Sequence, residues 1–257
     1  GTTMDRLIFT ALGAASSQGF QRVQLTNDLA NISTVGYKRS QASRPESARL
    51  NGPGFATRFQ PIVPTRVERV MLDGGTRMET GNPLDIAMND STVLGVQAAG
   101  GEIAFTRRGD LGVSEAGFLQ TGTGALVAGE GGAPITVPAG GTVDITPDGT
   151  VFFTQGGVEA AVAQPVGNLL LRDASAEILV RRTDGLFELE GANGAGGDFA
   201  TGPNIASVES GSLEGANVNP VEVMVNLLDF YRSFETQMKV IKSSEELDEG
   251  GAKLMRA

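Results

Sequence analysis

The stretch NPVEVMVNLLDFYRSFETQMKVI, residues 219–241, joins a helix start to a long apolar repeat and determines the fold that we expect. Asn219 is a favoured helix N-cap residue, and Pro220 stands at the first helical position, where no backbone N–H is needed. Apolar side chains then recur at alternating steps of three and four, which is the spacing of a seam between packed helices. These side chains are Met224, Leu227, Tyr231, Phe234, Met238 and Ile241.

The N-terminal segment predicts a helix that could pack along this seam. From Met4 to about Asn31 the chain has no proline, and its apolar residues follow helical spacing. A C-terminal helix continued to the chain end would extend about 57 Å, more than a β domain of this size would cover. We therefore expect the two helices to form an assembly interface, with an ordinary amphipathic core helix as the alternative. On the N-terminal side the interface positions are Ile8, Ala11, Ala15, Leu25 and Leu29.

The middle of the chain, from about Thr34 to Val218, predicts antiparallel β structure. Short apolar runs alternate with turn signals such as Pro147-Asp148-Gly149, and no clear helical window interrupts them. The glycine-rich run at residues 191–197 predicts a loop, because no Gly-Lys-Ser/Thr follows it to complete a phosphate cradle. The expected strands include Thr92–Gln97, Thr142–Thr146, Val151–Thr154, Asn168–Leu171 and Leu186–Leu189.

These patterns together predict an α+β fold. Long N- and C-terminal helices would pack as a coiled coil, with a central antiparallel β-rich domain inserted between them. We expect residues 4–36 to form the N-terminal helix, 37–80 an extended linker region and 81–205 the β-rich domain. Residues 206–257 would form a return segment and the C-terminal helix.

Composition argues against most site chemistry. The chain has no His and no Cys, so we expect no metal site, no cofactor and no disulfide. The formal net charge of −10 disfavours nucleic-acid binding. Residues 4–9, MDRLIF, lack a basic start followed by a long apolar core, so we expect no cleaved signal peptide.

An enzyme that uses carboxylates to act on glycans is one alternative, and a β-rich secreted adhesin is another. An acid–base pair could come from two aspartates at suitable separation. Most of the candidate aspartates stand beside turn residues, where Asp is common because it bonds to its own backbone. An adhesin would not need two helical ends. The candidate aspartates are Asp85, Asp90, Asp110, Asp144 and Asp148.

The segment NDLANISTVGYK, residues 27–38, resembles the N-terminal signature of flagellar axial proteins, the rod and hook subunits. That signature runs Asn-Asn-Leu-Ala-Asn, then a small insert, Thr, any residue, Gly, an aromatic and a basic residue. Asp28 departs from the usual second Asn. Gly36 could supply a positive φ where the helix ends. The matching positions are Asn27, Leu29, Ala30, Asn31, Thr34, Gly36 and Tyr37.

Further motifs follow in the order that these families have them. TGNPLDIA at residues 80–87 and FTRRGD at 105–110 resemble segments of rod and hook proteins. GSLEGANVNPVE at 211–222 continues into RSFETQMK at 232–239. The usual Gly-x-Gly-Phe-Phe is here Asp90-Ser91-Thr92-Val93-Leu94, which is a departure. The whole pattern is similar to the proximal-rod type.

The resemblance implies a structural subunit, not an enzyme. Such subunits assemble helically into the hollow rod of the basal body, which spans the periplasm and transmits torque. Their terminal helices form the inner tube and their β domains the outer shell. The implied partners are other copies of the chain, neighbouring rod proteins, the flagellar type III export apparatus and the rod cap, with no small-molecule substrate. Export from the cytoplasm would occur without a cleaved signal peptide. A distal-rod or hook subunit of the same family is the alternative.

Overall fold

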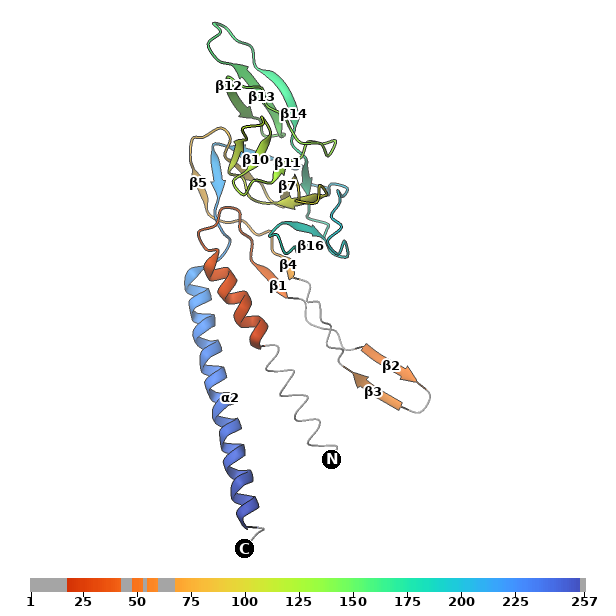
Figure 1. Cartoon of the computed structure of the whole chain (residues 1–257), viewed down its shortest axis with the longest axis vertical. Helices are drawn as coiled ribbons and strands as arrows, with labels where there is room; N and C mark the ends of the chain where they lie inside the picture. The colour runs from red at the N-terminus through yellow and green to blue at the C-terminus, as the bar shows by residue number, and fades with distance from the viewer. Residues whose placement is uncertain (1–17, 43–47, 53–54, 60–67, 255–257) are drawn as a thin grey trace. The chain divides into compact units, whose positions relative to one another are not determined.

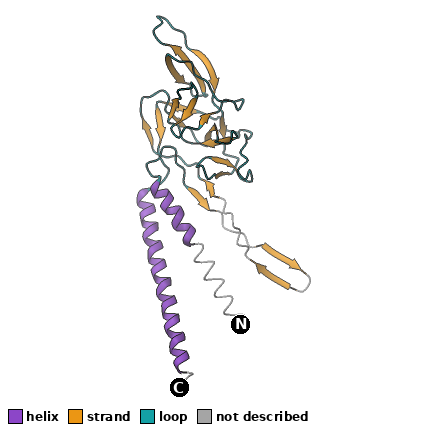
Figure 2. Ribbon diagram, in the orientation of Figure 1, coloured by secondary structure: helices purple, strands orange, loops and turns teal. Residues whose placement is uncertain are grey.

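The computed structural model describes residues 18–42, 48–52, 55–59 and 68–254. The chain divides into two compact units, which are residues 1–32 with 218–257, and residues 33–217. Figure 2 shows that the described helices belong to the first unit and the strands to the second. We call the first the helical unit and the second the β body.

The helical unit contains a helix over residues 18–30 and the helix α2 (Pro220–Leu254). The side-chain oxygen of Asn219 accepts the backbone N–H groups of Val221 and Glu222 at 3.0 and 3.4 Å, so the predicted N-cap is confirmed. At the end of helix 18–30, the backbone N–H and the side-chain amide of Asn31 both donate to the Asn27 carbonyl. A polar side chain therefore bonds a backbone group at each of these helix ends.

The expected coiled-coil architecture is wrong. The described chain is mostly β-sheet, and within the described ranges there is neither a long N-terminal helix nor a coiled coil. A coiled coil buries its apolar repeat, but Met224, Tyr231, Phe234 and Met238 are about half exposed. The repeat correctly identified an apolar face, but a repeat does not specify what covers that face.

Some positions of the expected interface cannot be placed. Ile8, Ala11 and Ala15 lie outside the described residues, as does the side chain of Ile241. The side chains that α2 does bury are Val223 and Phe230, with the half-buried Leu227 between them.

The β body is built on a sheet of ten strands in which every pairing is antiparallel. Strands distant in sequence lie next to each other, because β16 and β17 stand between β4 and β8. β15 (Leu171–Asp173) pairs with β7 beside the main path. The path runs β1 (Ser40–Ala42), β4 (Glu68–Val70), β16 (Leu179–Arg181), β17 (Phe187–Leu189), β8 (Ile103–Thr106), β7 (Thr92–Gln97), β11 (Leu126–Val127), β10 (Leu119–Thr121) and β9 (Leu111–Val113).

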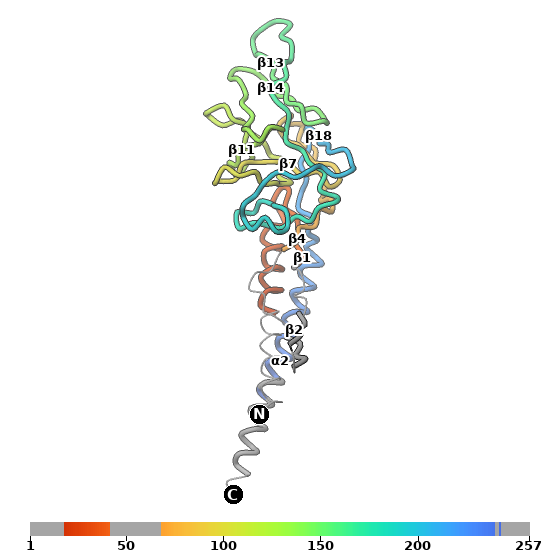
Figure 3. The backbone as a smooth tube through the Cα atoms, turned by 90° about the vertical axis from the view of Figure 1, so that its right-hand side faces the viewer, coloured from red at the N-terminus to blue at the C-terminus, as the bar shows by residue number. Residues whose placement is uncertain are grey.

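Four smaller sheets complete the described strands. Figures 1 and 3 both show β13 and β14 side by side, as their register requires. Two of the small sheets tie the return segment of the chain, in β18 and β19, to strands that come much earlier. The small sheets are β12 (Gly141–Ile145) with β13 (Thr150–Gln155) and β14 (Gln164–Asn168); β18 (Val208–Ser210) with β6 (Ile86–Met88); β19 (Ser212–Glu214) with β5 (Arg77–Glu79); and β2 (Ala48–Gly52) with β3 (Phe55–Phe59).

β7 lies at the centre of the hydrophobic core. Leu94 packs in one apolar cluster and Val93 in another, so both faces of the strand are covered. This double burial explains the unbroken apolar run there. The expected strand Thr92–Gln97 is confirmed as β7, and the strands expected at Thr142–Thr146, Val151–Thr154 and Leu186–Leu189 correspond to β12, β13 and β17.

The strand expected at Asn168–Leu171 is wrong. β14 ends at Asn168 and β15 begins at Leu171, so two strands meet where one was expected. Between β14 and β15, the Leu170 carbonyl accepts the Gly95 N–H, and the Leu170 N–H donates to the Ala128 carbonyl. An apolar run can mark such a crossing as easily as a strand, because both are buried.

Candidate assembly face and buried ion cluster

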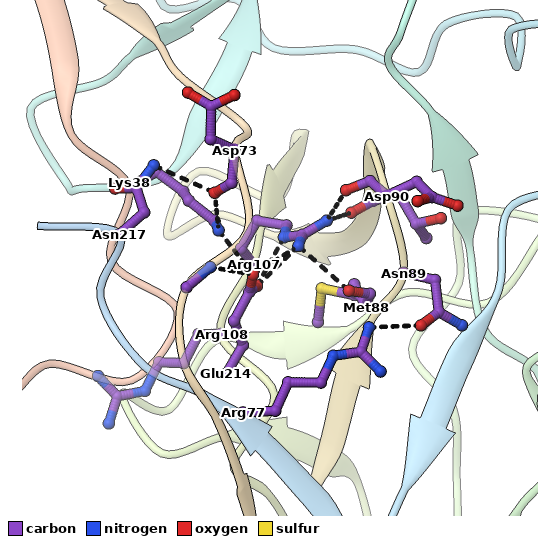
Figure 4. A network of polar contacts seen from close by, with 12 residues as sticks. Lys38, Asp73, Arg77, Met88, Asn89, Asp90, Arg107, Arg108, Glu214 and Asn217 are labelled. Atoms are coloured by element: carbon purple, nitrogen blue, oxygen red, sulfur yellow. Dashed lines mark hydrogen bonds and ion pairs between the residues drawn. The ribbon is translucent and has the colours of Figure 1, made fainter.

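Three charged side chains meet inside the β body. The Lys38 amine lies 2.7 Å from Glu214 Oε1, and the Arg107 guanidinium donates through Nε and Nη2 to the same carboxylate at 2.9 and 2.8 Å. Their exposed side-chain fractions are 0%, 1% and 3% for Lys38, Arg107 and Glu214. Figure 4 shows both cations pointing toward the carboxylate. We call these three residues the Glu214 cluster.

Backbone carbonyls accept further hydrogen bonds from both cations of the cluster. Arg107 donates Nη1 to the carbonyls of Asp90 and Thr92 at 2.6 and 2.8 Å, and Nη2 to that of Met88 at 3.1 Å. Lys38 donates to the Asp73 carbonyl at 2.7 Å. Hydrogen bonding of this kind is what allows charged groups to be buried.

The Glu214 cluster contains two cations and one anion. Burial, followed by repulsion from Arg107, lowers the pKa of the Lys38 amine to about 8, while the Glu214 carboxylate opposes the shift. Burial also lowers the pKa of Arg107, again against the effect of Glu214. The carboxylate is therefore the group that makes both buried cations tolerable.

The cluster joins three motifs that the sequence analysis treated separately. Lys38 ends the signature at residues 27–38, Arg107 lies in FTRRGD, and Glu214 lies in the GSLEG segment. Gly36 makes the approach possible, because its φ is +66° and a Cβ there would lie 2.3 Å from the Arg107 carbonyl oxygen. Its N–H donates to the Glu214 carbonyl at 2.7 Å. The expected positive φ is confirmed, but helix 18–30 ends well before Gly36; the close approach to Arg107 is what requires glycine there.

Around the cluster, the first and last residues of the β body are bonded to one another. The Asn217 N–H donates to the Tyr37 carbonyl at 3.2 Å, and the Arg39 N–H donates to Asn217 Oδ1 at 2.6 Å. The Asn217 amide also donates to the Met71 carbonyl at 2.9 Å. Arg181 lies over the Tyr37 ring at 4.7 Å. The aromatic and basic positions of the signature thus have local structural partners.

Helix α2 presents a wide apolar surface. Met224, Tyr231 and Met238, seven residues apart, are 54%, 56% and 49% exposed, and Phe234 at 48% lies on the same side. Val221, Val225 and Leu228 form a second exposed stripe at steps of four and three. The heptad pattern does not predict this second stripe, because the pattern follows one line along the helix. An exposed apolar surface on a helix is a candidate interaction site. We call the two stripes together the α2 face.

One signature residue of the helical unit, Asn27, lies close to this face. A surface hollow is lined by Arg22, Val23, Thr26, Asn27 and Tyr231, so Tyr231 lies beside helix 18–30. Leu25 and Leu29 are half-buried, Asn31 is partly buried and Ala30 is exposed. In the β body, Thr34 and Tyr37 are partly buried and Gly36 is buried.

Two aspartates of the enzyme alternative, Asp110 and Asp148, hold an ion pair and a turn. Arg108 Nε and Nη2 bond the two carboxylate oxygens of Asp110 at 2.6 and 2.7 Å. Hydrogen bonds from the Thr146 and Thr150 hydroxyls lower the pKa of Asp148, whereas a general acid near neutral pH needs a raised pKa. The expected glycine-rich loop is confirmed, and the N–H groups of Gly194 and Gly196 bond the chain's own Glu188.

The described residues contain no group of three or more Asp or Glu side chains placed to hold a metal ion. No described helix combines the length and apolar character needed to span a lipid bilayer.

Comparisons with known proteins agree with this arrangement. Residues 88–153 match the model described as "Flagellar hook protein FlgE/F/G D1 domain", and residues 209–254 match "Flagellar basal body rod FlgEFG protein C-terminal". These ranges include Arg107 and Glu214. The chain is 40% identical to the flagellar basal-body rod protein FlgF of Salmonella typhimurium, over 97% of each chain. It is 37% identical to the Escherichia coli FlgF over 95% of each chain. It is also 29% identical to the rod protein FlgG of Agrobacterium fabrum, over 95% of this chain and 97% of that protein.

The identity to FlgF proteins covers nearly the whole of both chains; one family model matches part of the β body, and the other matches the return segment together with α2. The chain therefore belongs to the FlgF family of flagellar basal-body rod proteins and is a structural subunit of the rod.

Proposed function

We propose that the chain assembles helically into the proximal part of a hollow rod that spans the periplasm and transmits torque. In this proposal the α2 face packs against helices of neighbouring subunits, with Leu25, Leu29 and the positions Ile8, Ala11, Ala15 and Ile241 contributing to the interface. The helical segments, within residues 4–36 and 206–257, would form the inner tube, and residues 81–205 the outer domain.

The observation that carries the proposal is the width of the α2 face. A helix in a two-stranded coiled coil needs one apolar stripe, because it has one partner. A helix in the wall of a closed tube has neighbours on both sides and needs two. The stripe of Met224, Tyr231 and Met238 and the stripe of Val221, Val225 and Leu228 supply them, both about half exposed or more in the isolated chain.

The partners follow from the family. We infer that the chain assembles with further copies of itself and with other rod and hook proteins. The resemblance to axial proteins further supports delivery by the flagellar type III export apparatus, without a cleaved signal peptide, and assembly beneath the rod cap. We also propose that the chain has no enzymatic activity. The absence of His and Cys from the sequence and the structural use of Asp110 and Asp148 support this view.

Cysteine protection tests the packing of the α2 face, since the chain has no Cys of its own. Tyr231→Cys in the purified monomer should react rapidly with a bulky maleimide, because Tyr231 is 56% exposed. The same variant in isolated basal bodies should react at least about tenfold more slowly, because neighbouring helices exclude the reagent. Ile205→Cys, at a β-body position that is 89% exposed, calibrates labelling of the monomer. Equal reactivity of Tyr231→Cys in monomer and basal body would rule out the proposed packing.

A further inference from the structure

The Glu214 cluster stands where the β body begins and ends. Lys38 lies just before β1, Glu214 is the last residue of β19, and Arg107 follows β8. Lys38 and Glu214 are 176 positions apart in the chain. The carboxylate of the return segment therefore contacts both the start of the β body and its interior.

We propose that Glu214 acts as a latch, whose carboxylate holds the segment of residues 34–42 against the body. Without its negative charge, Lys38 and Arg107 would repel each other, and the segment would open while the core of the body stayed folded. The latch is a conformational device within a single chain, and it does not depend on the proposed packing of α2.

The surroundings of the cluster show why one carboxylate has this effect. Asp73 and Asp90 contribute backbone carbonyls to the cations, and their charges act only from a distance. Arg77 adds a further positive charge near Arg107. Glu214 supplies the carboxylate that bonds both buried cations directly. A buried charge that loses its partner is far more costly than one never buried.

The two cations differ in what else holds them. Arg107 retains three backbone carbonyl acceptors when Glu214 is neutral, at Met88, Asp90 and Thr92. The Lys38 amine retains its hydrogen bond to the Asp73 carbonyl. The Lys38 segment is therefore the part that should open.

Hydrogen exchange on the full chain tests the latch, with Glu214→Gln as the perturbation. Gln has nearly the same shape, so the variant removes the charge and leaves the backbone bond from Gly36 to residue 214 available. Amides of residues 34–42 should exchange roughly 10- to 100-fold faster, as expected for loss of a hydrogen bond to a charged group. Amides of β7 and β13 should change less than about twofold. Glu235→Gln is the matched control, because Glu235 pairs with Lys239 at the surface of α2.

The double variant Lys38→Met, Glu214→Gln separates the latch from simple loss of packing. Removing the Lys38 charge abolishes the repulsion, so exchange in residues 34–42 should return to within about threefold of wild type. The double variant should also fold if Glu214→Gln alone does not. The proposal would be overturned if Glu214→Gln raised exchange equally in β7 and in residues 34–42. It would also be overturned if residues 34–42 exchanged as fast in the double variant as in the single one. An unchanged Glu214→Gln variant would overturn it too.

Discussion

Replacement of Gly36 by Ala tests the packing of the signature against the β body. The Gly36 φ of +66° already disfavours any residue with a Cβ. In addition, the new Cβ would lie 2.3 Å from the Arg107 carbonyl oxygen, 2.5 Å from its carbon and 2.6 Å from the Arg108 nitrogen. All three atoms belong to the backbone, so no side-chain rotation can make room.

The expected cost is the sum of two effects. The left-handed conformation costs an alanine about 1–2 kcal/mol. Forcing the backbones apart costs about 1–3 kcal/mol, typical of overpacking in a filled core. Gly36→Ala should therefore lower the free energy of unfolding by about 2–5 kcal/mol, a large part of the stability of an ordinary domain.

Urea denaturation followed by circular dichroism measures this loss, and Gly81→Ala is the matched control. Gly81 has a similar φ of +72°, but no heavy atom lies within 4 Å of its hypothetical Cβ. The control should show the conformational cost of about 1–2 kcal/mol alone. The reasoning is refuted if Gly36→Ala is no more destabilising than Gly81→Ala.

Three further changes have defined outcomes. Phe234→Glu should leave the monomer folded, because Phe234 is 48% exposed, but it should abolish motility in swarm plates. Cells that carry the control Lys242→Gln should swim. Normal swimming with Phe234→Glu would show that this side of α2 is not an interface. The folded-state pKa of Lys38, about 8, lies below its ordinary 10.5, so the unfolded chain binds more protons between these values. The free energy of unfolding, measured by urea titration at each pH, should therefore rise by up to about 3 kcal/mol as pH increases from 8 to 10.5. The Lys38→Met variant should lack this rise. Asp90→Gly should stabilise the chain by about 0.5–1 kcal/mol in the same assay, because Asp90 has a φ of +43° where rod proteins usually have Gly. A loss of stability would mean that the Asp90 side chain has a favourable role.

Local signals in the sequence predicted local structure well. The Asn219 cap and the strands β7, β12, β13 and β17 follow from residues near them in the chain. The motifs also identified the family, because each is a short segment whose residues occur in a characteristic order. Neither result required knowing which segments meet in space.

The Glu214 cluster could not be predicted in this way. Lys38, Arg107 and Glu214 are exposed residue types, and each lies in a segment that otherwise resembles a turn or a short strand. Their pairing depends on the return of β19 to β5, which the hydrophobic pattern does not encode. Charged residues repeated across separate family motifs were the available signal, and we interpreted them only as signature positions.

The coiled-coil prediction failed for a related reason. An apolar repeat shows that a helix face is favoured in a buried environment, but the partner can come from the same chain or from another. In α2 the face extends beyond the single seam to Val221, Val225 and Leu228, and both stripes are exposed in the isolated chain.

Imaging of basal bodies after deletion of the gene tests the central claim, that this chain is a structural subunit of the flagellar rod. Cells of the host should be examined by electron cryotomography with the gene deleted, and again with it restored on a plasmid. The account predicts that deletion leaves membrane rings without a complete rod or hook, and that the plasmid restores both. Complete rods bearing hooks in the deletion strain would contradict it.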